Sequence, residues 1–311
     1  MNPVELMNKI LYRVPKMPTQ ADIMFTNLCN LDCKMCPKYN FDLPSKHMNF
    51  KTFKKILDNL HGVKRISLIG YGEPLLNPSF FEAVRLAKGK GFHVTTVSNG
   101  HLLKSDTIFN KLVNCDIDAI RFSIETVEDK DVGGHQGDQE VLKRIAKLKE
   151  EWVKQGKQNK VIINTVIYDK TYDQIERIIG WAALCKLDMV DIAHYNRLGT
   201  KINPNMQISK ELALYSKIEK ANYPIRVCTL YDRYRGIRKI AFKNMTKCPM
   251  AYENVCIGVD GKVTPCICGF PTTYYGNVDD LKNVWNNNSF KIFRDNQKTI
   301  CLKCTLFKLY E

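Results

Sequence analysis

Residues 21–36 read ADIMFTNLCNLDCKMC, an apolar segment followed at once by three closely spaced cysteines. The apolar part, Ala21–Phe25, predicts a buried strand. Cys29, Cys33 and Cys36 then follow on one loop, with gaps of three and two residues. Three thiolates on so short a loop can bind three corners of an iron–sulfur cube and leave the fourth iron without a protein ligand. An open coordination position is typical of a catalytic rather than a structural metal site.

The alternative for this loop is a zinc knuckle. A structural zinc ion takes four closed ligands, and no further Cys or His occurs within the ten residues after Cys36. The spacing therefore favours an iron–sulfur cluster with an open iron over zinc.

Three more motifs follow strand-like segments. These motifs are Gly70-Tyr71-Gly72-Glu73-Pro74, Ser98-Asn99-Gly100 and Ser123-Ile124-Glu125. Together with the cysteine loop, they resemble the ordered motifs of the radical S-adenosylmethionine (SAM) enzymes, and the resemblance spans roughly residues 20–200. Met35 is one departure, because many members carry an aromatic residue there that shields the adenine; methionine is also apolar and polarizable.

The resemblance implies a mechanism and a set of SAM-binding residues. A [4Fe–4S] cluster on Cys29, Cys33 and Cys36 chelates SAM at its open iron. Reduction of the cluster then cleaves SAM to methionine and a 5′-deoxyadenosyl radical, which takes a hydrogen atom from the substrate. In relatives the motif glutamate, here Glu73, and the backbone beside it hold the amino group of SAM. The cofactor-binding residues implied are Gly70, Gly72, Glu73, Ser98, Asn99, Ser123 and Glu125.

The rest of the pattern predicts an α/β fold, a partial (β/α)6 TIM-like barrel. Strands are expected at 21–26, 65–69, 93–97, 119–124, 161–167 and 189–193, and helices at 50–60, 79–88, 106–113, 140–153 and 172–184. In such folds the loops after the strands build the site, which is where all four motifs lie. The expected domains are an N-terminal extension (1–20), the radical SAM partial barrel (21–200), a bridging segment with a helix at 209–220 (201–247), and a separate unit (248–311).

The C-terminal unit carries a second group of cysteines: Cys248, Cys256, Cys266, Cys268, Cys301 and Cys304. Asp260-Gly261 between two apolar runs predicts a β-hairpin, which brings Cys266 back beside Cys256 and Cys248. Cys301-x-x-Cys304 returns after a helical stretch, 278–294. Four thiolates form a closed set for a cubane or for zinc.

This region resembles the SPASM and twitch domains attached to many radical SAM enzymes. The matching segments are Cys248-Pro249, residues 257–266, Gly276-Asn277, Trp285 and Cys301-Leu302-Lys303-Cys304. The resemblance implies Cys248, Cys266, Cys301 and Cys304 as ligands of one auxiliary [4Fe–4S] cluster, a small hairpin-plus-helix domain of the shorter, twitch-like kind, with zinc as the alternative. Cys256 or Cys268 can act as a substitute ligand, as packing or as a hydrogen-atom donor, and these two are the candidate catalytic residues.

Three isolated cysteines and the residues after the sixth strand belong to no recognised motif. Cys115, Cys185 and Cys228 lie among apolar neighbours and are expected to be buried packing residues. His194-Tyr195-Asn196-Arg197 follows the sixth strand, so these side chains either reach a substrate at the barrel mouth or form a polar turn.

Composition and charge predict the cellular compartment of the protein and the classes of partner that it binds. The chain of 311 residues has no membrane-length apolar stretch and no signal-peptide core, so we expect a cytoplasmic protein with twelve reduced cysteines. Two clusters would subtract only about three charges from the formal +15. The basic segments 143–160 and 233–247 suit an acidic electron donor such as flavodoxin or ferredoxin, or an anionic substrate; nucleic acid ranks last, and for 143–160 a solvated helix face is an equal alternative.

The substrate class is the least determined point. Short relatives with a twitch domain oxidise or epimerise small polyhydroxylated molecules, and the early start of the barrel leaves no room for a peptide-leader-binding domain. We therefore expect a small polar, carbohydrate- or aminocyclitol-like substrate, with dehydrogenation ranked ahead of epimerisation. Modification of a ribosomally made peptide is the alternative, and a non-catalytic iron–sulfur or zinc protein is the remote one. Ile267 stands where sulfatase-maturing relatives usually carry an acidic residue, which argues against that activity.

Overall fold

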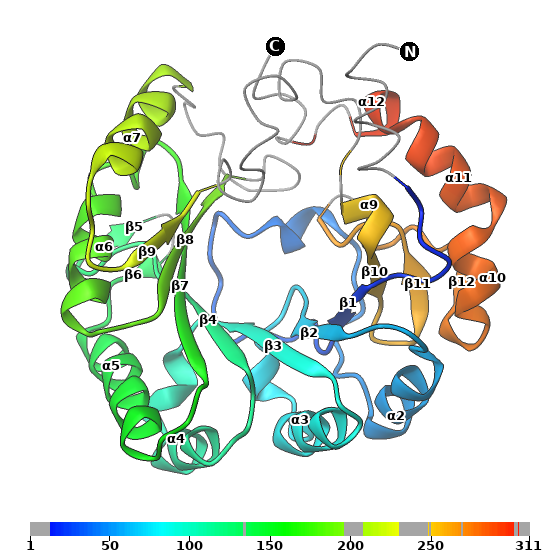
Figure 1. Cartoon of the computed structure of the whole chain (residues 1–311), viewed down its shortest axis with the longest axis horizontal. Coiled ribbons are helices and arrows are strands. Elements are labelled where there is room, and N and C mark those ends of the chain that lie inside the picture. Colours follow the sequence, from blue (N-terminus) through cyan, green and yellow to red (C-terminus); the bar gives the residue numbers. More distant parts are fainter. Residues whose placement is uncertain are drawn as a thin grey trace.

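The computed structural model describes residues 13–132, 135–195, 208–229, 248, 250–268, 270–301 and 304. One curved sheet of ten strands organises the chain, in the order β12-β11-β10-β1-β2-β3-β4-β7-β8-β9. Helices cover its outer side, and the loop between β1 and α2, drawn in blue, lies within the curve (Figure 1). Among the described residues, no helix is long and apolar enough to cross a membrane.

The six predicted barrel strands are present, with ends within three residues of the predicted ones. They are β1 (Gln20–Met24), β2 (Arg65–Ile69), β3 (His93–Ser98), β4 (Ala119–Ser123), β7 (Lys160–Ile167) and β8 (Met189–His194). Neighbouring strands in this series pair in parallel. The partial barrel expected from the alternation of strands and helices is therefore confirmed, because parallel neighbours need the helical crossovers that the sequence pattern predicts.

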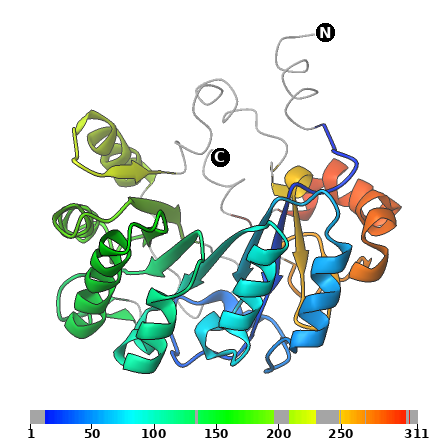
Figure 2. The same ribbon diagram turned by 60° about the horizontal axis from the view of Figure 1, so that its bottom comes forward.

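The predicted helices lie side by side along the outer face of the sheet (Figure 2). They are α2 (Phe50–Asn59), α3 (Phe80–Gly89), α4 (Asp106–Val113), α5 (Gln139–Lys154), α6 (Ile175–Leu184) and, in the predicted bridge, α7 (Ile208–Lys220). On α5, Asp138 caps the first turn by accepting from the backbone N–H groups of Glu140 and Val141. The apolar face of α5 is buried and Lys149 pairs with Asp188 at 2.7 Å, so its basic residues belong to an ordinary amphipathic helix.

Sequence reasoning missed two edges of the sheet. The short strand β9 (Arg226–Cys228) extends it beyond β8. On the other side, the predicted hairpin forms β10 (Asn254–Ile257) and β11 (Lys262–Thr264), with Gly261 at φ +82° in the turn. β10 pairs in parallel with β1, and β12 (Gly276–Asn277) closes this side. The hairpin expected in a separate unit is thus joined to the barrel by backbone hydrogen bonds.

The helical stretch predicted at 278–294 is broken into two helices. They are α10 (Leu281–Asn286) and α11 (Asn288–Asp295). Asn287 separates them because its side-chain oxygen caps α11 by accepting from the backbone N–H of Phe290 at 2.9 Å. The short helices α9 (Met250–Glu253) and α12 (Gln297–Ile300) flank the C-terminal cysteines. The basic segment 233–247 lies outside the described residues, and so do Asn196 and Arg197.

Candidate active site

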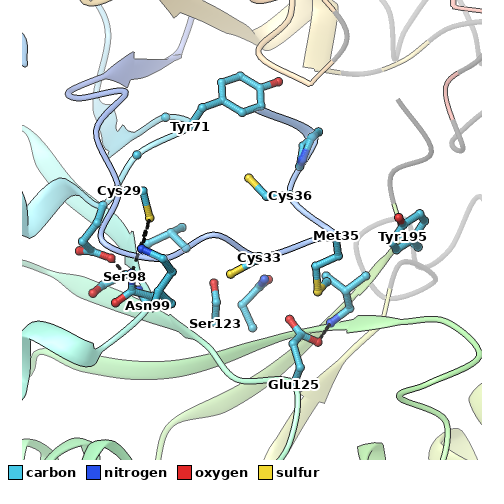
Figure 3. A pocket seen from close by; sticks show the side chains of 18 residues that line it. Cys29, Cys33, Met35, Cys36, Tyr71, Ser98, Asn99, Ser123, Glu125 and Tyr195 are labelled. Carbon is cyan, nitrogen blue, oxygen red and sulfur yellow. Dashed lines mark hydrogen bonds between the residues drawn. The ribbon is translucent and has the colours of Figure 1, made fainter. Parts of the chain in front are cut away.

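A cavity of about 310 Å³ opens at the carboxyl ends of the barrel strands. The three clustered cysteines and the seven predicted SAM-binding residues all line it. Figure 3 shows the side chains of Cys29, Cys33 and Cys36 gathered around the same space as Ser123 and Asn99. Four motifs that are far apart in the sequence therefore meet at one place, as parallel strands require when each motif follows a strand end.

The cysteine loop holds its three thiols close to one another. The backbone N–H of Cys36 donates to the carbonyl of Cys33 at 3.0 Å, which turns the loop back on itself. Two donors face the sulfur of Cys29, the Leu31 N–H at 3.5 Å and the Asn99 Nδ2 at 3.8 Å. Burial raises the pKa of Cys33 to about 12, and the neighbouring Cys36 and Cys29 thiolates add to the rise.

This environment fits a bound cation centre. Thiolates so close together repel one another in a buried site, and coordination to iron offsets that repulsion. Among the described residues, no three ligand side chains converge on a single point. The thiolates of a cubane each bind a different iron and so surround a volume rather than a point. Donors such as Asn99 Nδ2 beside Cys29 are the kind of hydrogen-bonding group that tunes cluster sulfurs.

The two glycines of residues 70–74 allow a close backbone approach. A Cβ on Gly72 would lie 2.3 Å from the carbonyl oxygen of Leu28, and one on Gly70, at φ +148°, would lie 2.8 Å from that of Thr26. The N–H of Glu73 donates to the Leu28 carbonyl at 2.8 Å. The glycines therefore let this loop pack directly on the segment that leads into Cys29.

Glu73 is buried and ties two motifs together. Its Oε2 accepts from the backbone N–H of Asn99 at 2.7 Å and its Oε1 accepts from that of Leu75 at 3.1 Å. Burial raises the pKa of this carboxyl to about 7, and these hydrogen bonds limit the rise. In turn, the side-chain oxygen of Asn99 accepts from the His101 N–H and that of Ser98 from the Gly100 N–H, which shapes the loop after β3.

Glu125 is a second buried carboxyl in the cavity wall, and it bonds to the end of β7. Its Oε2 accepts from the Thr165 hydroxyl at 3.1 Å and from the backbone N–H of Val166 at 2.8 Å. Burial again raises the pKa of the carboxyl to about 7. Ser123 ends β4 and lies beside Asn164 in the adjacent β7, so both contribute polar groups to the cavity wall.

Tyr168, which the sequence motifs do not include, packs beside residues of the cavity wall. Met35, Tyr168 and Tyr195 form an apolar cluster with Val132 and Val166, in which the two tyrosine rings lie 5.2 Å apart. The Tyr168 hydroxyl contacts the Met35 sulfur at 3.9 Å. Met35 thus lines the cavity at the position where family members carry an aromatic residue. Tyr195 lines it too, as one interpretation of residues 194–197 expects.

Tyr71 links this cavity to the C-terminal cysteines. Its ring lines the cavity and contacts Phe41 at 5.4 Å. Its hydroxyl donates to the backbone carbonyl of Ile267 and lies 3.5 Å from that of Cys268. Tyr71, between the two glycines of residues 70–74, is therefore a contact between the two cysteine groups.

The four cysteines expected to bind the auxiliary cluster come together. The buried Cys301 packs with Ala251, Tyr252 and Phe293, and Cys266 and Cys304 pack against them. Burial raises the pKa of Cys248 to about 12, with contributions from the thiolates of Cys266, Cys304 and Cys301. Three of the four cysteines therefore share one apolar cluster and their charges act on the fourth, and four thiolates are the donor set that a closed cubane needs.

The second strand of the hairpin ends before Cys266 and Cys268. Residues two apart on a strand face the same side. This rule does not apply to Cys266 and Cys268, because β11 ends at Thr264 and both cysteines lie in the turn that follows. The two thiols are nevertheless hydrogen-bonded to each other, which raises the pKa of Cys268. Cys268 is exposed whereas Cys256 is buried on β10, opposite Asp22 of β1.

The three remaining cysteines lie outside both groups. Cys115 and Cys228 are buried, in agreement with a packing role, whereas Cys185 at the end of α6 is only half-buried. Cys115 and Cys185 both contact the main hydrophobic core. The expectation of full burial is therefore wrong for Cys185, because the chain turns to the surface where α6 ends.

Comparison with known proteins identifies both units. The profile described as the radical SAM superfamily matches residues 23–182, and that of the SPASM iron–sulfur cluster-binding domain matches residues 248–305. The chain is 25% identical over 311 residues to the tungsten-containing aldehyde ferredoxin oxidoreductase cofactor-modifying protein of Pyrococcus furiosus, covering 90% of this chain and 85% of that protein. It is 23% identical over 294 residues to the AdoMet-dependent heme synthase of Methanosarcina barkeri, covering 86% and 82%.

Solved structures agree on the fold. The crystal structure of Streptococcus suis SuiB bound to S-adenosylmethionine has a TM-score of 0.70 at 22% identity, covering 98% of this chain and 74% of that one. Native anSMEcpe with bound AdoMet has a TM-score of 0.66 at 17% identity, covering 94% and 88%. The two matched domains imply SAM and [4Fe–4S] clusters, an auxiliary one included, as the cofactors. This chain belongs to the radical SAM superfamily and carries a SPASM iron–sulfur cluster-binding domain.

Proposed function

We propose that this protein is a radical SAM oxidoreductase that dehydrogenates or epimerises a small polar substrate. Cys29, Cys33 and Cys36 hold the [4Fe–4S] cluster, and Cys248, Cys266, Cys301 and Cys304 hold the auxiliary one. When bound, the cluster and SAM supply a 5′-deoxyadenosyl radical, which abstracts a hydrogen atom from the substrate. The observation that carries the proposal is the single cavity shared by the three thiols and all the SAM-motif residues.

Within this cavity the chain's own groups divide the work of binding SAM. Glu73 presents a buried carboxyl beside the loop of Ser98 and Asn99, which suits the ammonium group of SAM. Ser123, Asn99 and Glu125 offer hydrogen-bonding groups for ribose and carboxylate. Met35 and the tyrosines packed with it form an apolar wall that suits the adenine and excludes water from the reacting carbon.

The inner face of the barrel supports a polar substrate. Side chains alternate along a strand, so residues between the core-facing ones point inward. Inward-facing Ser67 and Thr95 are hydrogen-bonded at 2.9 Å on adjacent strands. Asp22 accepts from Asn254 at 2.5 Å, and Arg121 lies 3.9 Å from the carboxylate of Asp191. Polar groups of both charge signs on adjacent barrel strands suit a small molecule rich in hydrogen-bonding groups.

The names of the relatives that match most of the chain also support a small-molecule substrate. Their names describe a cofactor-modifying protein and a heme synthase. Over a shorter part of the chain, a nucleotide dehydratase of Selenomonas ruminantium is 26% identical across 196 residues, covering 60% of this chain. None of these names fixes the substrate, but heme and nucleotides are small molecules rather than peptides.

The fate of the substrate radical depends on the C-terminal thiols. Dehydrogenation needs an electron acceptor, which the auxiliary cluster supplies, and we rank it first. Epimerisation needs a hydrogen-atom donor, and the candidates are the two C-terminal thiols outside the proposed ligand set. Cys268 is exposed in the turn after β11, and Cys256 is buried on β10. An acidic flavodoxin or ferredoxin in the cytoplasm suits the formal charge of +15 as the electron donor.

The first test is SAM cleavage by the anaerobically reconstituted protein with a reductant. The wild type should form 5′-deoxyadenosine and contain about eight irons per chain. Replacing Cys29, Cys33 and Cys36 with Ala should abolish the product and leave about four irons. Cys185→Ala, outside both groups, is the matched control. Persisting SAM cleavage in the triple variant would contradict the site, and stoichiometric zinc beside four irons would contradict the auxiliary cluster.

The second test separates the two outcomes in deuterated water, with candidate small polar molecules supplied as substrate. A product without solvent deuterium, and unchanged turnover in Cys268→Ala and Cys256→Ala, supports dehydrogenation. Stable deuterium at the abstracted carbon, lost with either thiol, would reverse our ranking in favour of epimerisation. Turnover only with a peptide would overturn the substrate class.

A further inference from the structure

Gln297 connects two segments that carry the proposed auxiliary ligands. It is the first residue of α12, the short helix that ends directly before Cys301, and its side chain is buried, with the residue 1% exposed. Its backbone carbonyl accepts from the Cys301 N–H at 2.8 Å. Its side-chain Oε1 accepts from the backbone N–H of Cys248 at 2.7 Å, across 49 residues of sequence. One side chain therefore fixes the position of Cys248 relative to the Cys301–Cys304 pair.

The hydrogen bond to Cys248 also fixes the orientation of the amide. A backbone N–H only donates, so the Gln297 atom that faces it is the oxygen. The amide nitrogen Nε2 then lies on the other side of the group. Among the described residues it has no hydrogen-bond partner, although it is fully buried. A buried donor without an acceptor costs free energy, so such a group calls for a partner.

The apolar cluster beside the Cys301–Cys304 pair contains three of the proposed ligand sulfurs. Ala251, Phe293 and Cys301 pack together there, and Cys266 and Cys304 pack against them. Tyr252 and Tyr275 are the hydroxyl-bearing side chains of this cluster, and the Tyr252 hydroxyl donates to the carbonyl of Arg294 at 3.1 Å. The thiolates of Cys266, Cys304 and Cys301 all raise the pKa of Cys248, whose backbone N–H is the group bonded to Gln297.

We propose that Gln297 Nε2 donates a hydrogen bond to a sulfide of the auxiliary cluster. This inference rests on the proposed ligand set. A donor aimed at a cluster sulfur stabilises the reduced form, which carries more negative charge, and so raises the reduction potential. Gln297 is a positioning and tuning residue rather than a catalytic one. It helps decide how readily the cluster accepts an electron.

The test uses the full chain with Cys29, Cys33 and Cys36 replaced by Ala, so that the auxiliary cluster alone is observed. Gln297→Glu keeps an acceptor for the Cys248 N–H but loses the N–H donor; Gln297→Met loses both. Asn296→Asp adds the same charge one residue away on an exposed side chain and is the matched control. The readouts are the midpoint potential from an EPR-monitored titration, the iron content, and the nitrogen coupling in pulsed EPR of protein labelled with side-chain ¹⁵N-glutamine.

We expect the parent to show a ¹⁵N coupling that disappears in Gln297→Met. Gln297→Glu should retain about four irons. Its reduced-to-oxidised ratio at a fixed potential should fall at least tenfold, a shift of about 59 mV for one electron. Asn296→Asp should move the potential less.

An intact cluster in Gln297→Glu with an unchanged midpoint, or a parent without ¹⁵N coupling, would overturn the proposal. If Gln297→Met loses its iron, Gln297→Glu decides. Absence of iron in the parent would overturn the ligand set, whereas SAM cleavage by the wild type tests the proposed function separately.

Discussion

Replacing Glu125 with Gln should stabilise the cluster-free protein at alkaline pH. Among the described residues, hydrogen bonds reach only one oxygen of Glu125: Oε2 accepts from both the Thr165 hydroxyl and the Val166 N–H. The amide oxygen of glutamine can occupy the same position and keep both hydrogen bonds. The substitution therefore removes a buried carboxyl charge and preserves the local structure.

The magnitude follows from the pKa of the buried carboxyl. Burial raises it from 4.5 to about 7. The folded state then holds its proton more tightly than the unfolded state, so stability is full below pH 4.5 and falls as pH rises to about 7. At 1.36 kcal/mol per pKa unit, the loss is roughly 3 kcal/mol. The amide of Glu125→Gln cannot titrate, so the variant should match the wild type near pH 4.5 and exceed it by up to about 3 kcal/mol at pH 8.

The assay is urea unfolding of the cluster-free full chain across this pH range, followed by circular dichroism. Glu73→Gln is the matched control, because burial raises the pKa of Glu73 to about 7 as well. Glu73 uses both oxygens, one for the Leu75 N–H and one for the Asn99 N–H. Glutamine there turns an amide N–H₂ toward a backbone donor, which costs about 1–3 kcal/mol. Its gain at pH 8 should therefore be smaller.

Two results would refute this reasoning. One is a free-energy difference between Glu125→Gln and the wild type that does not grow between pH 4.5 and 8. The other is a gain in Glu73→Gln as large as that in Glu125→Gln, which would mean that the hydrogen-bond geometry does not matter.

Two further substitutions test the contacts around the cavity. Tyr71→Phe loses the hydrogen bond to the Ile267 carbonyl, worth about 1 kcal/mol, so backbone amide exchange across the Cys266–Cys268 turn should accelerate. Tyr168→Phe is the control, because the Tyr168 hydroxyl contacts the Met35 sulfur at 3.9 Å instead, and it should leave exchange in that turn unchanged. Equal acceleration in both variants would contradict the connection between Tyr71 and the turn. Gly72→Ala puts a methyl group 2.3 Å from the Leu28 carbonyl, so iron content should fall to that of the auxiliary cluster alone, and full iron content would contradict the close packing.

The barrel could be predicted from the sequence because its signals are local. Each strand is an apolar run and each helix an amphipathic stretch, as on α5, where Val141, Leu142 and Ile145 are buried. The rule that motifs follow strand ends then predicted a common location without any contact information. The glycines at 70 and 72 were recognised from the motif, but the backbone approach that requires them is visible only in three dimensions.

The parts that could not be predicted depend on contacts distant in sequence. The partner of Tyr71, the carbonyl of Ile267, lies 196 residues away, so no local pattern predicts this contact. Tyr168 joins Met35 and Tyr195 in one cluster, and its own local sequence carries no motif. The chain turns after Thr264, where β11 ends, so the alternation of side chains along a strand does not relate Cys266 to Cys268.

The pairing of β1 with β10 has a consequence for the relation between the two cysteine groups. β1 leads directly into the loop of Cys29, and β10 leads through the hairpin to Cys266. Because four residues of each strand are in register, backbone hydrogen bonds rather than a flexible linker connect the two sites. The Tyr71 hydroxyl adds a second connection, from the loop after β2 to the turn after β11. A hinge between the barrel and the hairpin would break both connections, so the proposed transfer of an electron from a substrate radical to the auxiliary cluster operates across a fixed separation.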